Sequence, residues 1–110
     1  MKPSPTYYAV IPADVRYSDL KANAKLLYGE ITALSSKEGY CFATNRYFAD
    51  LYGVTKNTIS LWVSNLKQKG FVSVTLIKVG EQITERRICI IKNSDSSNFI
   101  NDDLNIIKVI

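Results

Sequence analysis

Residues 55–70 hold side chains whose types suit hydrogen bonding to base edges and phosphate groups. Apolar residues recur there at helical spacing, and they are Ile59, Trp62, Val63 and Leu66. With that stripe turned inward, 3.6 residues per turn leaves a polar or small set outside, namely Lys56, Asn57, Ser60, Leu61, Ser64 and Lys67. The Asn57 amide can pair with adenine, and Lys56 can reach guanine or phosphate. The hydroxyls of Ser60 and Ser64 can bond to bases or phosphate, and Leu61 can contact a thymine methyl. We therefore predict that this face, together with Thr58, reads bases.

Acidic residues are missing from this part of the chain. From Thr55 to Ile83 the only carboxylate is Glu81, whereas a solvated helix face usually mixes acids with lysines. Excluding carboxylates is what a surface facing phosphates requires, because each acid would repel the duplex. The alternative is a solvated face that lacks acids by chance.

The positive charge is concentrated in the second half of the chain. The net charge is +4, and residues 56–92 hold seven basic residues against Glu81 and Glu85. Residues 93–110 carry three aspartates against Lys108. A polyanion would therefore be drawn to residues 56–92.

Three helices are expected to position these side chains. Apolar residues at helical spacing predict a first long helix over residues 21–35, which Gly39 follows. Thr44 is the expected cap of a second helix of about two turns that ends at Gly53. Thr55 caps a third helix that runs to residue 69, and Gly70 ends it.

The second helix is predicted to place its apolar residues in the core and its first turn near phosphate. The apolar residues are Tyr47, Phe48, Leu51 and Tyr52, and we expect Trp62 and Tyr28 to be structural as well. Thr44, Asn45 and Arg46 open the helix, where free N–H groups and the positive end of the helix dipole suit a phosphate.

A β-hairpin is predicted after the third helix. Residues 71–79 and 84–92 are rich in β-branched side chains, and residues 80–83 join them. The hairpin places Lys78, Arg86 and Arg87 near its tip and second strand, where they can reach phosphate or the minor groove. The alternative is that Glu81 and Glu85 pair with the arginines.

The two ends of the chain differ from the middle. Prolines 3, 5 and 12 are expected to prevent an early helix, and residues 7–11 to form an extended arm laid against the body. Residues 93–98 contain no apolar side chain and are interpreted as a linker. The apolar tail, residues 99–110, packs back, pairs with a partner chain or begins a longer protein. We thus assign residues 1–92 to one domain and residues 93–110 to a linker and tail.

Composition excludes several classes of protein. No apolar run approaches the length of a membrane span, and the start lacks a signal peptide, so we expect a cytoplasmic protein without membrane contact. The chain has no histidine and only Cys41 and Cys89, which are expected to pack as small apolar groups, so we predict no metal site and no cofactor. With no histidine, no glycine-rich phosphate loop and no clustered carboxylates, we expect no enzyme.

The order helix, short extended piece, short helix, glycine turn, longer helix and hairpin predicts an α+β fold, the winged helix-turn-helix. It comprises three helices and a two- to three-stranded antiparallel wing. In this fold the helix after the turn lies in the major groove of double-stranded DNA.

Residues 23–74 resemble a known family of DNA-binding domains. The matching segments are Ala24–Tyr28, Gly39–Phe42 with Asn45, Gly53–Thr55, Thr58–Ser60, Trp62–Val63, and Leu66 with Gly70. They resemble the N-terminal winged-helix domain of plasmid and phage replication initiators, the RepA N-terminal and DnaD-like replisome organiser group. The resemblance implies recognition of double-stranded repeats (iterons) at a replication origin, a homodimer, and contact with helicase or its loader through a further C-terminal domain.

Two other functions stay open at this point. A transcriptional regulator would use the same DNA-binding domain for a different purpose. A protein-interaction module would dock a partner on the hairpin and tail, while the third helix only packs.

Overall fold

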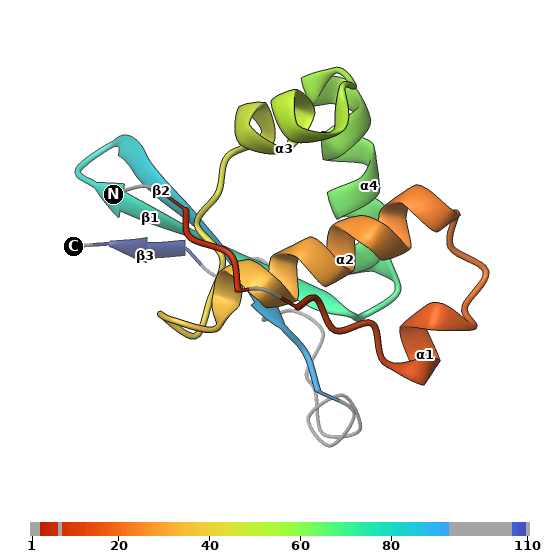
Figure 1. The fold of residues 1–110 in the computed structure, drawn as a ribbon. Coiled ribbons are helices and arrows are strands. Elements are labelled where there is room, and N and C mark those ends of the chain that lie inside the picture. The colour runs from red at the N-terminus through yellow and green to blue at the C-terminus, as the bar shows by residue number, and fades with distance from the viewer. Residues whose placement is uncertain (1–2, 7, 93–106, 110) are drawn as a thin grey trace.

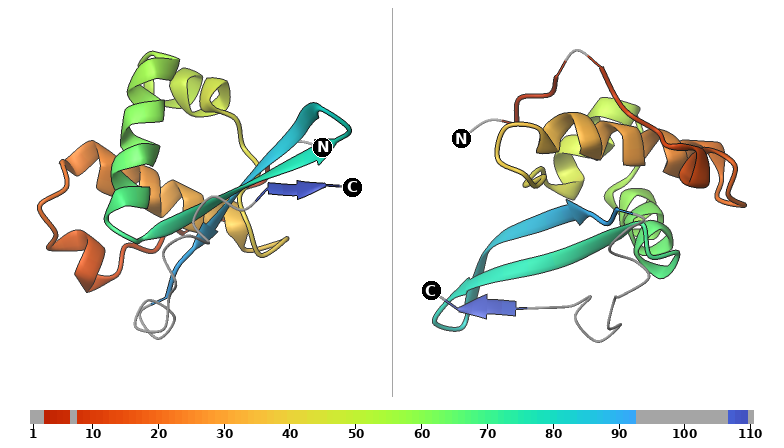
Figure 2. Two further views of the ribbon diagram at one scale, coloured as in Figure 1. Left: turned by 180° about the vertical axis from the view of Figure 1, so that it is seen from behind. Right: turned by 90° about the horizontal axis from the view of Figure 1, so that it is seen from below.

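The computed structural model describes residues 3–6, 8–92 and 107–109. The helices are α1 (Ala13–Arg16), α2 (Ala22–Ser35), α3 (Asn45–Tyr52) and α4 (Lys56–Gln68). The strands are β1 (Val72–Val79), β2 (Gln82–Ile90) and β3 (Ile107–Val109). The helices pack together at one end of the β1–β2 hairpin, and the hairpin tip projects beyond them (Figures 1 and 2). The predicted α+β winged helix-turn-helix fold is confirmed.

The boundaries of α3 and α4 follow from local hydrogen bonding. The Thr44 hydroxyl accepts from the Tyr47 N–H at 3.1 Å, and the Thr55 hydroxyl accepts from the Thr58 N–H at 3.1 Å. Gly53 and Gly70 follow the two helices with φ of 67° and 78°, a left-handed conformation that glycine adopts at little cost. The predicted caps and both glycine ends are confirmed.

The Thr55 cap provides a first quantitative prediction. Replacing Thr55 by alanine removes the acceptor for the Thr58 N–H, so the domain should lose about 1 kcal/mol of unfolding free energy. Urea denaturation followed by circular dichroism measures the loss. Thr55→Ser, which keeps the hydroxyl, should stay close to the parent protein, and an equal loss in both variants would contradict a role for the hydroxyl.

The core lies where α2, α3 and α4 meet the base of the sheet. Leu27 and Ile31 of α2 are fully buried, as are Ile59 and Leu66 of α4. The aromatic residues predicted as structural all belong to this core or pack on it, namely Tyr28, Tyr47, Phe48, Tyr52 and Trp62. Tyr28 meets Phe71 edge to face at 6.3 Å, and Tyr52 meets Trp62 at 6.5 Å.

Burial of the two cysteines differs. Cys41 is fully buried, as expected for a small apolar group, and burial raises the pKa of its thiol, whereas Cys89 is only half-buried.

The prediction that Leu51 is a core residue was wrong. Its side chain is 51% exposed, and Ala49 is buried in its place. The face of α3 that packs inward carries residues 48, 49 and 52, and at 100° per residue Leu51 falls at the edge of that face. In a helix of only two turns, the sequence alone does not determine which of the neighbouring apolar residues face the core.

Three details of the chain path also differ from the predictions. One additional helical turn, α1, follows Pro12, which suits a helix start because its missing N–H is not needed there. The hairpin turn is shorter than expected, because Gln82 and Ile83 already pair with β1. A register shift leaves Thr84 of β2 without a partner between the Ile77–Glu85 and Lys78–Ile83 pairs, which is a β-bulge.

The antiparallel pairing of β1 and β2 confirms the predicted wing, and the third strand, β3, is parallel to β1 rather than antiparallel. β3 pairs with β1, placing Ile77 opposite Lys108, and the sheet order is β2-β1-β3. A strand that returns after residues 91–106 has enough chain for a parallel crossover, which a short hairpin loop does not. The predicted linker at 93–98 lies outside the described residues, as does most of the apolar tail, and the division at residue 92 stays a prediction.

The N-terminal arm crosses the surface of α2. The Thr6 N–H donates to the Ala33 carbonyl at 3.1 Å, and the Val10 N–H donates to the Thr32 hydroxyl at 2.9 Å. Gly29 of α2 lies beneath the arm, where a Cβ atom would stand 3.0 Å from Ile11 Cγ1. The arm is laid against the body as predicted, although its described residues form no β-strand.

Candidate nucleic-acid interface

The outer face of α4 presents most of the residues predicted to read bases. Lys56, Asn57, Ser60, Leu61 and Ser64 are exposed, and Leu61 retains 58% of its accessible surface. Lys67 is half-buried. Thr58 is half-buried as well, and its hydroxyl lies 3.0 Å from that of Thr55, so it completes the cap rather than pointing outward. The inward stripe and the outward face divide as the spacing predicted.

The first turns of α3 and α4 contain no acidic residue. The positive end of a helix dipole is normally complemented by Asp or Glu, and α4 instead begins with Lys56. This placement costs stability in the free domain, and it leaves the starts of α3 and α4, like that of α2, without a carboxylate in the first turn. Such ends favour an anionic partner.

The three residues that open α3 have different surroundings. Thr44 and Arg46 are exposed, and Thr44 also serves as the cap. Asn45 is half-buried, and its side-chain oxygen accepts from the guanidinium of Arg86 at 2.6 Å. Asn45 is thus held by β2.

Arg86 joins the hairpin to the start of α3. One terminal nitrogen donates to Asn45, and the other donates to the Ala43 carbonyl at 2.8 Å. Burial lowers the pKa of the guanidinium. The sequence placed Arg86 among phosphate contacts, and the structure gives both of its terminal nitrogens partners within the domain.

A backbone bridge reinforces the same junction. Cys41 and Ile88 exchange two N–H to carbonyl bonds of 2.8 Å, which pairs the segment before α3 with β2. A hollow of about 460 Å³ lies between this segment and the hairpin, lined by residues 42–45 and 83–86. The junction fixes where the hairpin stands relative to the helix-turn-helix unit.

Arg87 is engaged on the other face of β2. Its Nε donates to the Glu85 carboxylate, and its guanidinium stacks on the Tyr40 ring at 4.4 Å. The hydrogen bond to Glu85 raises the pKa of Arg87. The alternative in which an acidic residue pairs with an arginine of the hairpin therefore holds for this pair.

The tip of the hairpin is more apolar than the sequence interpretation suggested. Lys78 is half-buried in β1 opposite Ile83, whereas Val79 and Ile83 are each about half exposed. The register pairs Ile83 with Lys78 and Val79 with Gln82, so the two exposed apolar side chains lie on opposite faces of the tip.

Other kinds of site find no support in the described part of the chain. No group of three His, Cys, Asp or Glu side chains there is placed to hold a metal ion. Within the same residues, no helix combines the length and apolar character needed to cross a membrane.

Comparison with known proteins bears directly on the helical unit. A helix-turn-helix domain family matches residues 18–72, which cover α2, α3, α4 and the first residue of β1. Neither the curated proteins nor the solved structures gave a significant match. Helix-turn-helix domains are typically non-enzymatic, and this one suggests DNA as its partner. The match covers 55 of the 110 residues, which is half of the sequence, and the chain therefore belongs to this helix-turn-helix domain family.

Proposed function

We propose that this domain binds double-stranded DNA sequence-specifically, with α4 in the major groove, and that it recognises an origin in plasmid or phage replication initiation. The observation that carries the DNA-binding part is the outer face of α4, which is exposed, free of carboxylates and preceded by an unneutralised helix start. The replication role rests on the resemblance of residues 23–74 to replication initiators. The homodimer and helicase contacts implied by that resemblance stay predictions.

The residues predicted to bind DNA divide into two contacting groups and one supporting group in this proposal. Base edges are contacted by the outer face of α4, namely Lys56, Asn57, Ser60, Leu61 and Ser64. Phosphates are contacted by Thr44, Arg46, Lys67, Lys78 and Arg87. Thr58, Asn45 and Arg86 support these groups through the hydrogen bonds described above.

Selection of bound duplexes from a random pool, followed by a salt titration of the winner, tests the proposal. We expect one enriched sequence, bound at least about a thousandfold more tightly than random DNA. The logarithm of its binding constant should fall linearly with the logarithm of salt concentration, with a slope near −0.9 for each phosphate contacted. Equal affinity for random and selected duplexes would refute sequence-specific binding.

The position of the selected sequence separates the two biological purposes. Several close copies beside a replication gene support origin recognition, whereas a single copy over a promoter supports a transcriptional regulator. A protein-interaction module predicts no duplex binding at all, with partner binding that survives replacement of Lys56 and Asn57 by alanine.

A further inference from the structure

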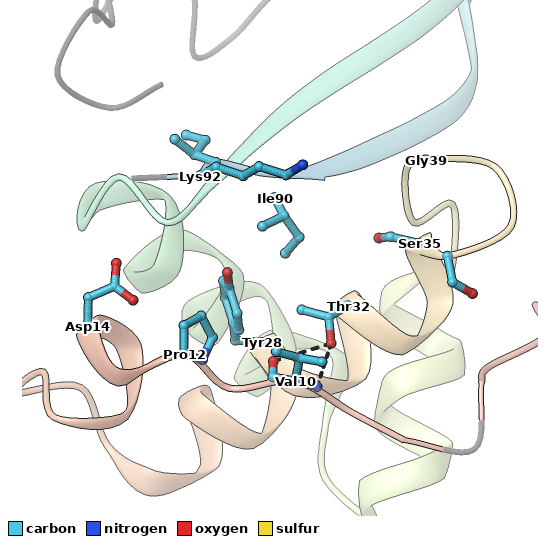
Figure 3. Close-up of a pocket in the computed structure, with 11 residues that line it drawn as sticks. Val10, Pro12, Asp14, Tyr28, Thr32, Ser35, Gly39, Ile90 and Lys92 are labelled. Carbon is cyan, nitrogen blue, oxygen red and sulfur yellow. Dashed lines mark hydrogen bonds between the residues drawn. The ribbon is translucent and has the colours of Figure 1, made fainter. Parts of the chain in front are cut away.

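A hollow of about 550 Å³ lies between the N-terminal arm, α2 and the end of β2 (Figure 3). Its walls include the apolar side chains of Val10, Pro12 and Ile90. No residue of α3 or α4 is among the lining residues described. The hollow has the volume of a small-molecule site and is separate from the proposed DNA-binding face.

Tyr28 brings a polar atom to the wall of this hollow. The residue is only 3% exposed, and its hydroxyl points into the open space (Figure 3). Within the described residues this hydroxyl has no hydrogen-bond partner, whereas the neighbouring Thr32 and Ser35 hydroxyls donate to carbonyls of α2 at 2.6 Å. Desolvation raises the pKa of Tyr28, so the hydroxyl stays protonated and can donate at neutral pH.

A second donor lies at the rim. Lys92 follows β2, and its ammonium group lies on the side of the hollow away from Asp14 (Figure 3). The Asp14 carboxylate accepts from the Val15 N–H at 2.9 Å, which holds it toward α1. The groups available to an occupant are thus a neutral O–H donor and a cation beside apolar walls, with the Asp14 carboxylate on the side of the hollow away from the cation.

We propose that this hollow binds a small carboxylate with an apolar body. The carboxylate accepts hydrogen bonds from the Tyr28 hydroxyl and the Lys92 ammonium, and the body packs on Val10, Pro12 and Ile90. An occupant with a positive charge is disfavoured by Lys92, and one without an acceptor leaves the Tyr28 hydroxyl unpaired.

Titration of the ¹⁵N-labelled full chain with 3-phenylpropanoate, without DNA, tests the proposal. The amide signals of Val10, Thr32 and Ile91 should shift together and saturate. The primary amide of the same acid keeps the apolar body and removes the charge, so it should bind about ten times more weakly. Absence of any saturable shift up to about 10 mM, a concentration that corresponds to about 2.7 kcal/mol of binding free energy, overturns the proposal.

Two substitutions locate the contacts. Tyr28→Phe removes only the hydroxyl and should weaken binding about five- to tenfold without lowering the Tm, because that hydroxyl has no described partner in the protein. Lys92→Gln should weaken binding of the acid and leave binding of the amide unchanged. The matched controls are Tyr17→Phe and Lys37→Gln, which alter exposed residues outside the hollow. Unchanged affinity in Tyr28→Phe and Lys92→Gln means that the acid binds elsewhere and refutes the site.

Discussion

Replacing Lys56 by glutamate is expected to weaken DNA binding by about ten- to a hundredfold while making the free domain slightly more stable. Lys56 is the first residue of α4, where its charge opposes the helix dipole. A carboxylate at this position should add about 0.3 to 1 kcal/mol to the unfolding free energy. In the complex the same carboxylate loses a contact worth about 1 to 3 kcal/mol and repels the duplex.

Fluorescence anisotropy with the selected duplex and urea denaturation measure the two effects. Lys37→Glu is the matched control, because it makes the same change in net charge at an exposed position outside the proposed interface. If both variants lose affinity equally, net charge alone controls binding and α4 has no special role. Opposite signs for stability and binding in Lys56→Glu alone would show that this helix start is adapted to its partner.

Replacing Arg86 by alanine should destabilise the domain by about 2 kcal/mol. The substitution leaves the Ala43 carbonyl and the Asn45 side chain without their partner at a part-buried junction. The adjacent Arg87 provides a matched control on the opposite face of β2, where it forms a partly solvated ion pair with Glu85 and leaves no backbone group without its partner when it is removed. Arg87→Ala should therefore change stability little.

Urea denaturation of the two variants measures this difference. In Arg86→Ala the amide signals of residues 43–45 should shift, because the start of α3 loses its connection to the hairpin. Arg86→Lys keeps the charge but cannot form both bonds with one ammonium group, so it should recover only part of the stability. A larger loss in Arg87→Ala than in Arg86→Ala would contradict the positioning role.

The parts of the fold that the sequence predicted correctly depend on short-range chemistry. Thr44 and Thr55 cap helices through N–H groups three residues further along, and Gly53 ends α3 by its own backbone conformation. The outward face of α4 follows from a stripe of apolar residues within the same helix. Each of these features is decided within one or two helical turns.

The parts that the sequence did not predict depend on contacts between distant segments. Arg86 and Asn45 are 41 residues apart, and nothing local distinguishes an arginine that binds phosphate from one that holds a helix start. Leu51 is apolar, but its exposure is set by how α3 is rotated against α2 and α4. Tyr28 was correctly placed in the core, yet the free hydroxyl depends on the arm and β2 leaving a space beside it.

Gly29 shows that the unit which folds is larger than the unit which the family shares. The matched stretch begins at residue 18, but α2 has no side chain at Gly29 because Ile11 occupies that space, with Ala9 also within reach. Side chains that precede the shared stretch therefore fill the space beside Gly29, a helix position inside that stretch. A shortened version of this protein that begins at residue 18 would keep every helix of the shared unit. It would nevertheless expose to solvent the surface of α2 around Gly29 that the arm covers. Among the described residues the arm first bonds to α2 at Thr6, so a boundary drawn by packing falls at or before that residue.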